Sequence, residues 1–427
     1  MKSKPRKRLV LGSVITITSA RMEGGSNILA CNYTGDHLAT SDMKQNKRLW
    51  IGCGFNAFGQ LYVVENERKI QNFKEIAINA NVRNLKCSWS YSVSANECSL
   101  RMYGFIHGQT KNTKTVTADN SIKSLASCDR YCLLLLKNGS VFKYGVQCLE
   151  GQLEELIFQT NEIFTPKKIS IFGDPTASSC TSHIKIDHIA CGNNIMVALG
   201  KWNEVFTGTT QVHRFPKHVR IQQLVCGFEH ALLLTYNGDI YSWGNGLRGQ
   251  LGLDVIGIEE KPVLLEAMAG IKIKCIAASG WHSAAISTFS DLYTWGFNSN
   301  GQLGLRIYKT GDVKEPALYV LPQLIDTANF NCCEAQDGGG CYPIKVVCGA
   351  RHTIVLMNCG SIYATGWNAY GQLGLKNSTL YTDKFVCVLK IENIIDDDVE
   401  IVCGPWNTLI GMHKDGKYLL NDICIEH

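Results

Sequence analysis

The sequence has little of what would indicate a membrane protein or a nucleic-acid-binding protein. No run of about eighteen apolar residues is present, so no membrane-spanning helix is predicted. The formal net charge is only +5 over 427 residues, which is too small to indicate a nucleic-acid surface by itself. These absences remove membrane spans and charge-driven nucleic-acid binding from the predicted functions.

The sequence also lacks the motifs of an enzyme. It shows no Ser-His-Asp order, no phosphate-binding glycine-rich loop and no arrangement of paired carboxylates. Cys332, Cys333 and Cys341 gather in a polar insert, but a zinc site would need a fourth ligand and a paired Cys-x-x-Cys spacing, which are missing. We expect a non-enzyme with no cofactor, metal site or catalytic residue.

Disulfides are not expected, although nineteen cysteines are present. Their number is odd, and Cys191, Cys226, Cys348 and Cys403 stand at one repeated position where a small apolar side chain fits. A long chain with a large core does not need disulfides. We expect reduced thiols, as in the cytosol or nucleus.

The informative feature that is present is an internal repeat. Its clearest copy begins at Cys226-Gly227, passes His230, turns at Asn237-Gly238 and ends at Trp243-Gly244. Two apolar runs joined by Asn-Gly are typical of a β-hairpin, because that turn needs positive φ at both central residues. No copy shows helical periodicity over ten or more residues. Each repeat therefore predicts a small antiparallel sheet.

Seven copies of the repeat are present, and we number the predicted sheets as blades 1 to 7. The copies start near residues 87, 127, 191, 226, 278, 348 and 403.

The balance of starts and endings predicts how the chain closes. The last start, at Cys403, has no aromatic-Gly pair after it, whereas an unmatched ending stands at Trp50 to Gly54. The two balance if the N-terminal segment completes the C-terminal sheet, which leaves no long open edge. We predict an all-β, seven-bladed β-propeller over 48–420, closed by an N-terminal strand in the C-terminal blade. Residues 1–47 are expected to form a partly disordered tail, and 421–427 a C-terminal tail.

Residues at equivalent repeat positions are predicted to have structural roles. One histidine in a blade, always at the same position, indicates bonding to a neighbouring backbone group rather than catalysis or metal binding. The glycine after the aromatic residue lets the chain turn without a Cβ clash. The predicted structural positions are Gly54, Gly104, Gly145, Gly208, His230, Gly244, His282, Gly296, His352 and Gly366.

The two residues after each start are predicted to surround one mouth of the central channel, because we expect the innermost strand of each blade to begin there. Aromatic and arginine side chains on such a rim are typical anchors for a protein partner. Packing between blades is the alternative role for the tryptophans. The predicted partner-binding residues are Trp89, Arg130, Phe228, Glu229, Trp281, Arg351 and Trp406.

The N-terminal segment is basic, with Lys2, Lys4, Arg6, Lys7 and Arg8 ahead of a moderately apolar stretch. This pattern fits a nuclear localisation signal, a weak signal peptide or an uninformative tail. The sequence leaves these alternatives open.

The motifs Cys-Gly-x-x-His, Tyr-x-Trp-Gly and Gly-Gln-Leu-Gly resemble those of the regulator of chromosome condensation repeat family, over roughly residues 48 to 420. Within that family, Gly280 to Ser283 and Cys403 to Thr408 are most similar to one member. The resemblance implies a non-enzymatic interaction platform that binds a Jumonji-C oxygenase, lysine-specific demethylase 8. It also implies an indirect link to histones or chromatin, with roles in histone-methylation control and chromosome segregation. We expect a monomer in the nucleus and on chromosomes, with the cytoplasm as a further location.

Two further expectations come from the resemblance. The oxygenase resembles arginyl hydroxylases, which makes Arg214, before blade 4, a candidate for hydroxylation and Arg220 the alternative. The wider family is known for guanine-nucleotide exchange on a Ran-like small GTPase, which is the alternative function. That activity uses a protruding hairpin, and the inserts near 150–186 and 305–345 show no clear hairpin.

Overall fold

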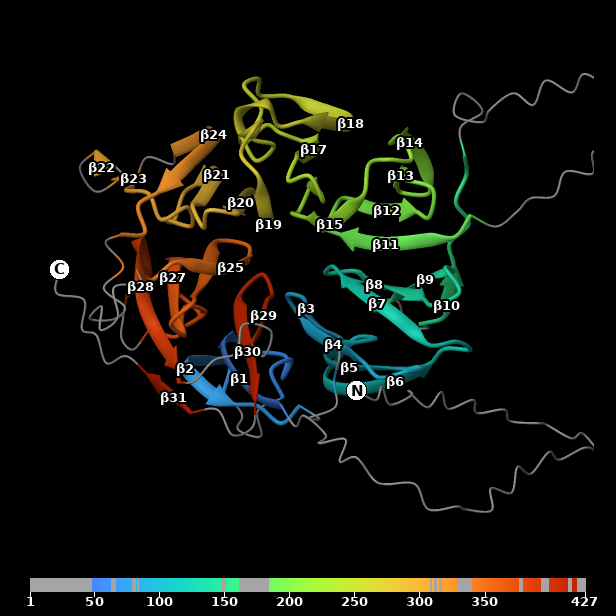
Figure 1. Ribbon diagram of the computed structural model, residues 1–427. Helices are drawn as coiled ribbons and strands as arrows, with labels where there is room; N and C mark the ends of the chain where they lie inside the picture. Colours follow the sequence, from blue (N-terminus) through green and yellow to red (C-terminus); the bar gives the residue numbers. More distant parts are fainter. Residues whose placement is uncertain are drawn as a thin grey trace, which may run out of the picture. The chain divides into compact units, whose positions relative to one another are not determined.

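The computed structural model describes residues 48–420, apart from 63–66, 79–81, 83, 148–150, 161–183, 308, 311–312, 315–316, 329, 331–339, 376–378, 393–398 and 414–416. Over these residues the fold is almost entirely β, with one 3-10 turn, η2 (Glu266–Met268). Seven main sheets surround a centre (Figure 1), which confirms the predicted seven-bladed propeller. The predicted tails at 1–47 and 421–427, together with Cys332 and Cys333, lie outside the described residues.

Blades 1 to 4 each contain four consecutive antiparallel strands, paired in chain order. The bounds in blades 1 and 2 are β3 (Asn84–Cys87), β4 (Tyr91–Ala95), β5 (Ser99–Ile106), β6 (Gln109–Thr117), β7 (Ile122–Ser127), β8 (Tyr131–Leu136), β9 (Val141–Gly145) and β10 (Leu153–Glu155). Those in blades 3 and 4 are β11 (Ile186–Cys191), β12 (Met196–Gly200), β13 (Glu204–Thr207), β14 (Thr210–Arg214), β15 (Ile221–Cys226), β16 (His230–Thr235), β17 (Ile240–Asn245) and β18 (Ile258–Leu264).

Blades 5 and 6 depart from this plan by an insertion and an added strand. Blade 5 contains β19 (Ile273–Ser279), β20 (His282–Ser287), β21 (Leu292–Asn298) and β24 (Ala317–Ile325). Blade 6 contains β25 (Pro343–Cys348), β26 (His352–Met357), β27 (Ser361–Trp367), β28 (Tyr381–Ile391) and β31 (Tyr418–Leu420). Between β21 and β24 a separate hairpin forms from β22 (Lys309–Thr310) and β23 (Val313–Lys314). The sequence predicted no hairpin there, because strands of two residues are too short to show an alternation.

Blade 7 joins strands from opposite ends of the described chain. Its order is β2-β1-β30-β29, from β2 (Lys69–Glu75), β1 (Arg48–Phe55), β30 (Asn407–His413) and β29 (Glu400–Cys403). In β1, Trp50 lies opposite Gly411 and Gly54 opposite Asn407. The same register pairs Gly244 with His230 in blade 4. Strand β1 thus occupies in blade 7 the position that β17 occupies in blade 4.

Each predicted blade start lies at the end of the first strand and not at its beginning. For example, β15 begins at Ile221 and ends at Cys226. The next residue, Gly227, must lack a side chain, because a Cβ there would lie 2.1 Å from Cε1 of His230 in the same blade. The expectation that the innermost strand begins at these residues is therefore wrong. The residues still gather at one end of the propeller, since all seven first strands end there.

A buried hydroxyl group connects each of the C-terminal blades to the next. In blade 5, Ser283 Oγ donates a hydrogen bond to the Gln250 carbonyl of blade 4 (2.9 Å) and lies 2.9 Å from Nε2 of His230. Because the hydroxyl has one proton and gives it to the carbonyl, His230 must donate from Nε2. The same arrangement recurs twice, in His282–Thr353–Gln302 and in His352–Thr408–Gln372. The predicted bond from the repeated histidines to a neighbouring backbone group is therefore wrong in its partner: each histidine bonds a side-chain hydroxyl of the next blade, and that hydroxyl bonds the backbone.

Blade 1 uses a tyrosine where these blades use histidine. Tyr91 donates its hydroxyl to the carbonyl oxygens of Cys128 and Tyr131 in blade 2, both at 2.8 Å. On the side toward blade 7, Ser92 donates to the carbonyl of Gln60 at 2.6 Å. The longer tyrosine side chain reaches the backbone of the next blade directly, so that no intervening hydroxyl is needed.

The apolar core lies in the layers between neighbouring blades. Trp243 is fully buried and packs with Val197 and Leu199 of blade 3, and Trp295 packs in the same way with Leu232 and Leu234 of blade 4. Their indole nitrogens donate to Thr207 Oγ1 (3.2 Å) and to the Gln250 carbonyl (3.0 Å). An aromatic ring that is both packed and hydrogen-bonded fixes the angle between two sheets.

Thr408 tests the contribution of one such hydroxyl. In the Thr408→Val variant, His352 and the Gln372 carbonyl lose their buried partner, which should lower the free energy of unfolding by about 2–4 kcal/mol. Urea unfolding followed by fluorescence would measure it. The matched control is Thr113→Val on the exposed face of β6, which should change stability by less than about 0.5 kcal/mol. Equal effects of the two substitutions would contradict the proposed role of the hydroxyl.

The three histidines also predict how stability depends on pH. Burial lowers the pKa of His230, His282 and His352 to about 3, whereas the unfolded value is about 6.5. Below pH 6.5 the unfolded chain therefore binds more protons, and stability falls as pH falls toward 3. At pH 5 the loss should be about 2 kcal/mol per histidine. Urea titrations at pH 7 and pH 5 would measure it, and His282→Gln should reduce the difference by about a third. A stability that does not change between these pH values would refute the assignment.

Candidate protein-binding rim

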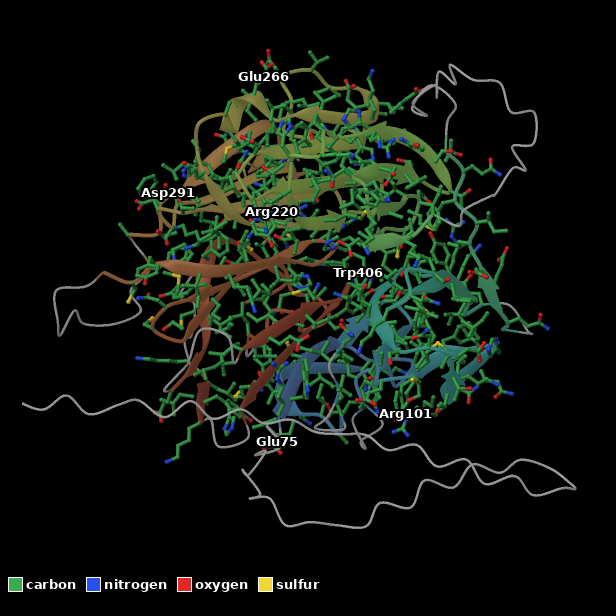
Figure 2. All side chains as sticks on the ribbon, turned by 45° about the vertical axis from the view of Figure 1, so that its right-hand side comes forward. Glu75, Arg101, Arg220, Glu266, Asp291 and Trp406 are labelled. Carbon is green, nitrogen blue, oxygen red and sulfur yellow. The ribbon has the colours of Figure 1, made fainter. Side chains whose placement is uncertain are left out.

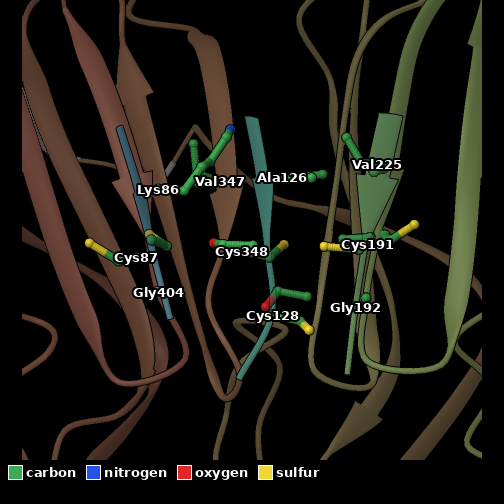
Figure 3. A pocket seen from close by; sticks show the side chains of 18 of the residues that line it. Lys86, Cys87, Ala126, Cys128, Cys191, Gly192, Val225, Val347, Cys348 and Gly404 are labelled. Carbon is green, nitrogen blue, oxygen red and sulfur yellow. The ribbon is translucent and has the colours of Figure 1, made fainter. Parts of the chain in front are cut away.

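The first strands of all seven blades line a central channel. The channel has a volume of about 300 Å³ and is lined by residues of β3, β7, β11, β15, β19, β25 and β29. Figure 3 shows Cys87, Cys128, Cys191 and Cys348 on the strands around it. The lining is made mainly of small apolar side chains and backbone, so the channel offers few groups that could recognise a ligand.

The cysteines of the channel are free thiols that differ in their acidity. Burial raises the pKa of Cys87, Cys226 and Cys348. Cys128 is different, because a side-chain hydrogen bond with Cys191 lowers its pKa to about 7. No disulfide joins any two of the thirteen cysteines in the described part of the chain. No group of three or more His, Cys, Asp or Glu residues that could hold a metal occurs among the described residues.

Two sets of loops lie at the end of the propeller where the first strands end, and we call this end the rim. One set joins the first strand of a blade to the second. The other follows the third strand and contains the Gly-Gln-Leu segments, because antiparallel pairing brings the third strand back to the same end. The rim therefore combines residues that are about twenty positions apart in each repeat.

On blades 4 and 5 the rim carries an aromatic cluster with one arginine. The rings of Phe228 and Trp281 meet edge to face at 5.5 Å, and Trp281 meets Phe297 at 6.3 Å. The guanidinium of Arg248 lies 4.2 Å from the centre of the Trp281 ring. Glu229 accepts from Nε1 of Trp281 at 3.4 Å and from Nδ2 of Asn194 at 3.0 Å. These contacts hold the exposed edges of the rings in fixed positions.

A second aromatic cluster continues across blades 6, 7 and 1. Trp406 meets Trp367 at 4.9 Å and Tyr370 at 6.0 Å. Arg351 lies over both tryptophans, 5.4 Å from Trp367 and 5.9 Å from Trp406. From Tyr370 the ring contacts extend to blade 1 through Phe55, Phe58 and Trp89. Trp89 is 40% exposed. Figure 2 labels Trp406 near the centre of the ring of blades.

Blades 2 and 3 have a polar rim instead. Asp129 accepts hydrogen bonds from Ser88 Oγ at 2.8 Å and from Asn193 Nδ2 at 2.8 Å. Arg130 is exposed and donates to the Asn193 carbonyl. The rim is thus divided into an aromatic arc with two arginines, on blades 4 to 1, and a polar arc on blades 2 and 3.

The structure brings most of the predicted rim residues together and adds others. Phe228, Glu229 and Trp281 form one cluster, and Arg351 and Trp406 belong to the other. Trp89 joins the second cluster through the two phenylalanines of blade 7, whereas Arg130 lies apart on the polar arc. The sequence prediction missed Arg248, Phe297, Trp367 and Tyr370, which come from the third strands and the loops after them. Their position could have been predicted from the hairpin topology, since the third strand ends where the second begins.

The two candidate arginines for hydroxylation differ in accessibility. Arg214, in β14, donates from Nη2 to Oε1 of Glu204 at 2.8 Å, and the Glu204 side chain is only 7% exposed. Arg220 is exposed, with its guanidinium 4.6 Å over the ring of Tyr236. It immediately precedes β15, so it lies at the end of the blade opposite to the rim.

No helix of the described part of the chain is long and apolar enough to cross a membrane.

Comparisons with known proteins agree with this architecture. Two family models, both described as the regulator of chromosome condensation (RCC1) repeat, match the chain, one at 237–286 and 290–356 and the other at 221–250 and 344–372. RCC1 domain-containing protein 1 of Homo sapiens is 34% identical over 222 residues, which are 47% of this chain and 58% of that protein. The ultraviolet-B receptor UVR8 of Arabidopsis thaliana is 33% identical over 199 residues, 47% of this chain and 40% of the receptor. The chain thus spans less than two thirds of these relatives.

Solved structures show the same fold at low sequence identity. Prp20p of Saccharomyces cerevisiae, described with its binding to Gsp1p and histones, has a TM-score of 0.63 and 18% identity, covering 90% of this chain and 96% of Prp20p. Human WBSCR16 has a TM-score of 0.64 and 14% identity, covering 86% of this chain and 99% of that one. Between residues 221 and 372 the chain therefore contains segments that match the regulator of chromosome condensation (RCC1) repeat, and its described residues fold into a β-propeller like that of Prp20p.

Proposed function

We propose that this chain is a non-catalytic protein-binding platform whose rim binds a Jumonji-C oxygenase, lysine-specific demethylase 8. Through that partner it would act in the nucleus and on chromosomes, in histone-methylation control and chromosome segregation. The similarity to RCC1 domain-containing protein 1 supports this choice of partner. The observation that carries the proposal is the aromatic arc with Arg248 and Arg351, since tryptophan, tyrosine and arginine contribute most to binding energy at protein interfaces.

The rim is suited to binding because its rings are held before a partner arrives. Trp281 is fixed by Glu229 and by Arg248, and Trp406 by Trp367 and by Arg351. A side chain that is already ordered loses little conformational entropy on binding. Trp281 and Trp406 are half-buried on the rim and do not fill the layers between blades. Their position therefore favours partner binding over the alternative role in packing.

The structure changes the order of the two candidate arginines for hydroxylation. Arg214 would have to break its ion pair with Glu204, which is mostly buried, before entering an active site. Arg220 is exposed and contacts only a ring face in the described contacts. We therefore favour Arg220 over Arg214 as the substrate position. Because Arg220 lies at the end opposite to the rim, its modification needs a contact with the oxygenase that is separate from rim binding.

Affinity purification with mass spectrometry tests the partner. The full chain should retain lysine-specific demethylase 8, and Trp281→Ala and Trp406→Ala should each reduce the retained amount by about 10-fold or more. Trp202→Ala is the matched control, because Trp202 is exposed but lies in the turn between β12 and β13, at the end opposite to the rim. A complex that survives both rim substitutions would exclude the rim as the binding site.

After incubation with the oxygenase, a gain of one oxygen atom on Arg220 is expected, and no gain on any arginine would exclude the modification.

Nucleotide exchange on a Ran-like GTPase is the second candidate function. Its support is the fold shared with Prp20p and the small β22–β23 hairpin of blade 5. If exchange is the function, the chain should accelerate release of labelled GDP from the GTPase by orders of magnitude at catalytic concentrations. We expect no acceleration, and rapid release would replace the platform proposal.

A further inference from the structure

Arg248 and Arg351 have the features of a site for a negatively charged group. Arg248 lies between two rings, 4.2 Å from the centre of Trp281 and 5.0 Å from that of Phe297. Arg351 lies over Trp367 and Trp406, and donates from Nη1 to Oδ1 of Asn300 at 3.3 Å. Contact with the ring faces restricts each guanidinium, and N–H groups that these contacts do not use can donate to an oxygen ligand.

The two guanidinium groups are close enough to repel each other. Burial, followed by the charge of Arg248, lowers the pKa of Arg351. Neither arginine takes part in an ion pair with any of the described residues. Two like charges that repel each other and form no ion pair raise the free energy of the empty rim, and an anion that reaches both would lower it.

A groove of about 400 Å³ with both apolar and polar walls includes Arg248. It is lined by Glu229, Asn245, Leu247, Arg248, Phe297 and Leu318. Leu247 and Leu318 are 55% and 43% exposed. An open groove with two exposed leucines and an aromatic wall matches one large aliphatic side chain.

We propose that this part of the rim recognises an acidic peptide segment of a protein partner. One carboxylate of the segment lies between Arg248 and Arg351, and a neighbouring leucine-like side chain enters the groove. This inference deepens the proposed function, because it gives the chemical character of the partner segment. The groove's own carboxylate, Glu229, is held by Trp281 and Asn194 and does not pair with Arg248. The negative charge of Glu229 lowers the affinity of the groove for an acidic peptide. It favours peptide segments whose carboxylate lies at the arginine pair and not beside Glu229.

Fluorescence anisotropy with a labelled twelve-residue peptide of alternating Glu-Leu pairs tests the proposal on the full chain. The peptide should bind, and versions with lysine for glutamate or serine for leucine should not. Arg248→Ala and Arg351→Ala should each weaken binding by about 10-fold or more, and Leu247→Asp by about 10-fold. Glu229→Gln should strengthen binding by about 3-fold at low salt, because it removes a like charge.

Arg101→Ala is the matched control, since Arg101 is exposed on β5 of blade 1 (Figure 2) and lies away from the rim. Arg248→Lys keeps the charge but not the planar fork, so it should recover part of the affinity. Thermal unfolding of each variant shows whether the fold is intact.

Unchanged peptide affinity in folded Arg248→Ala and Arg351→Ala, or no binding of the acidic peptide, would overturn the proposal. If the oxygenase is still retained in that case, only the acidic-peptide inference fails. If the peptide binds but the oxygenase is not retained, the named partner fails instead.

Discussion

The propeller depends on a small set of buried polar contacts between neighbouring blades. A serine or threonine hydroxyl of one blade donates to the Gln carbonyl of the blade before it and accepts from that blade's histidine, as Ser283, Thr353 and Thr408 do. Such a contact is directional, unlike the apolar packing around it, so it fixes the position of one sheet relative to the next. Burial lowers the pKa of these histidines and so keeps them neutral, with the ring proton on the Nε2 that donates to the hydroxyl.

The same contacts explain why the repeat carries its glycines. Gly227 gives the His230 ring its space, and a Cβ on Gly244, where φ is +102°, would lie 2.5 Å from the Glu229 carbonyl oxygen. Both glycines thus allow close approach around one histidine. The residue just before the histidine, Glu229, is forced outward to the rim. A constraint that arises inside the blade therefore determines which residues face a partner.

The rim combines this rigidity with chemistry suited to protein recognition. Trp281, Trp406 and the two arginines over their rings form one arc, while Asp129 and Arg130 of blade 2 both form hydrogen bonds with Asn193 of blade 3. The central channel is lined mainly by small apolar side chains and offers little specific chemistry. The proposed binding of a partner by the aromatic arc uses the part of the rim where tryptophan and arginine side chains gather.

The sequence alone determined the number of blades, because the start and end of each repeat are marked by residues that local geometry requires. It also determined that residues such as Trp281 and Arg351 share one end, since equivalent positions of a repeat must lie at equivalent places. Only the tertiary structure decided that the innermost strand ends at these residues. The composition of a short apolar strand does not indicate which of its ends lies at the rim. Only the tertiary structure placed Arg248 over the ring of Trp281, since these residues belong to two different blades and meet through packing, which no spacing along the chain encodes.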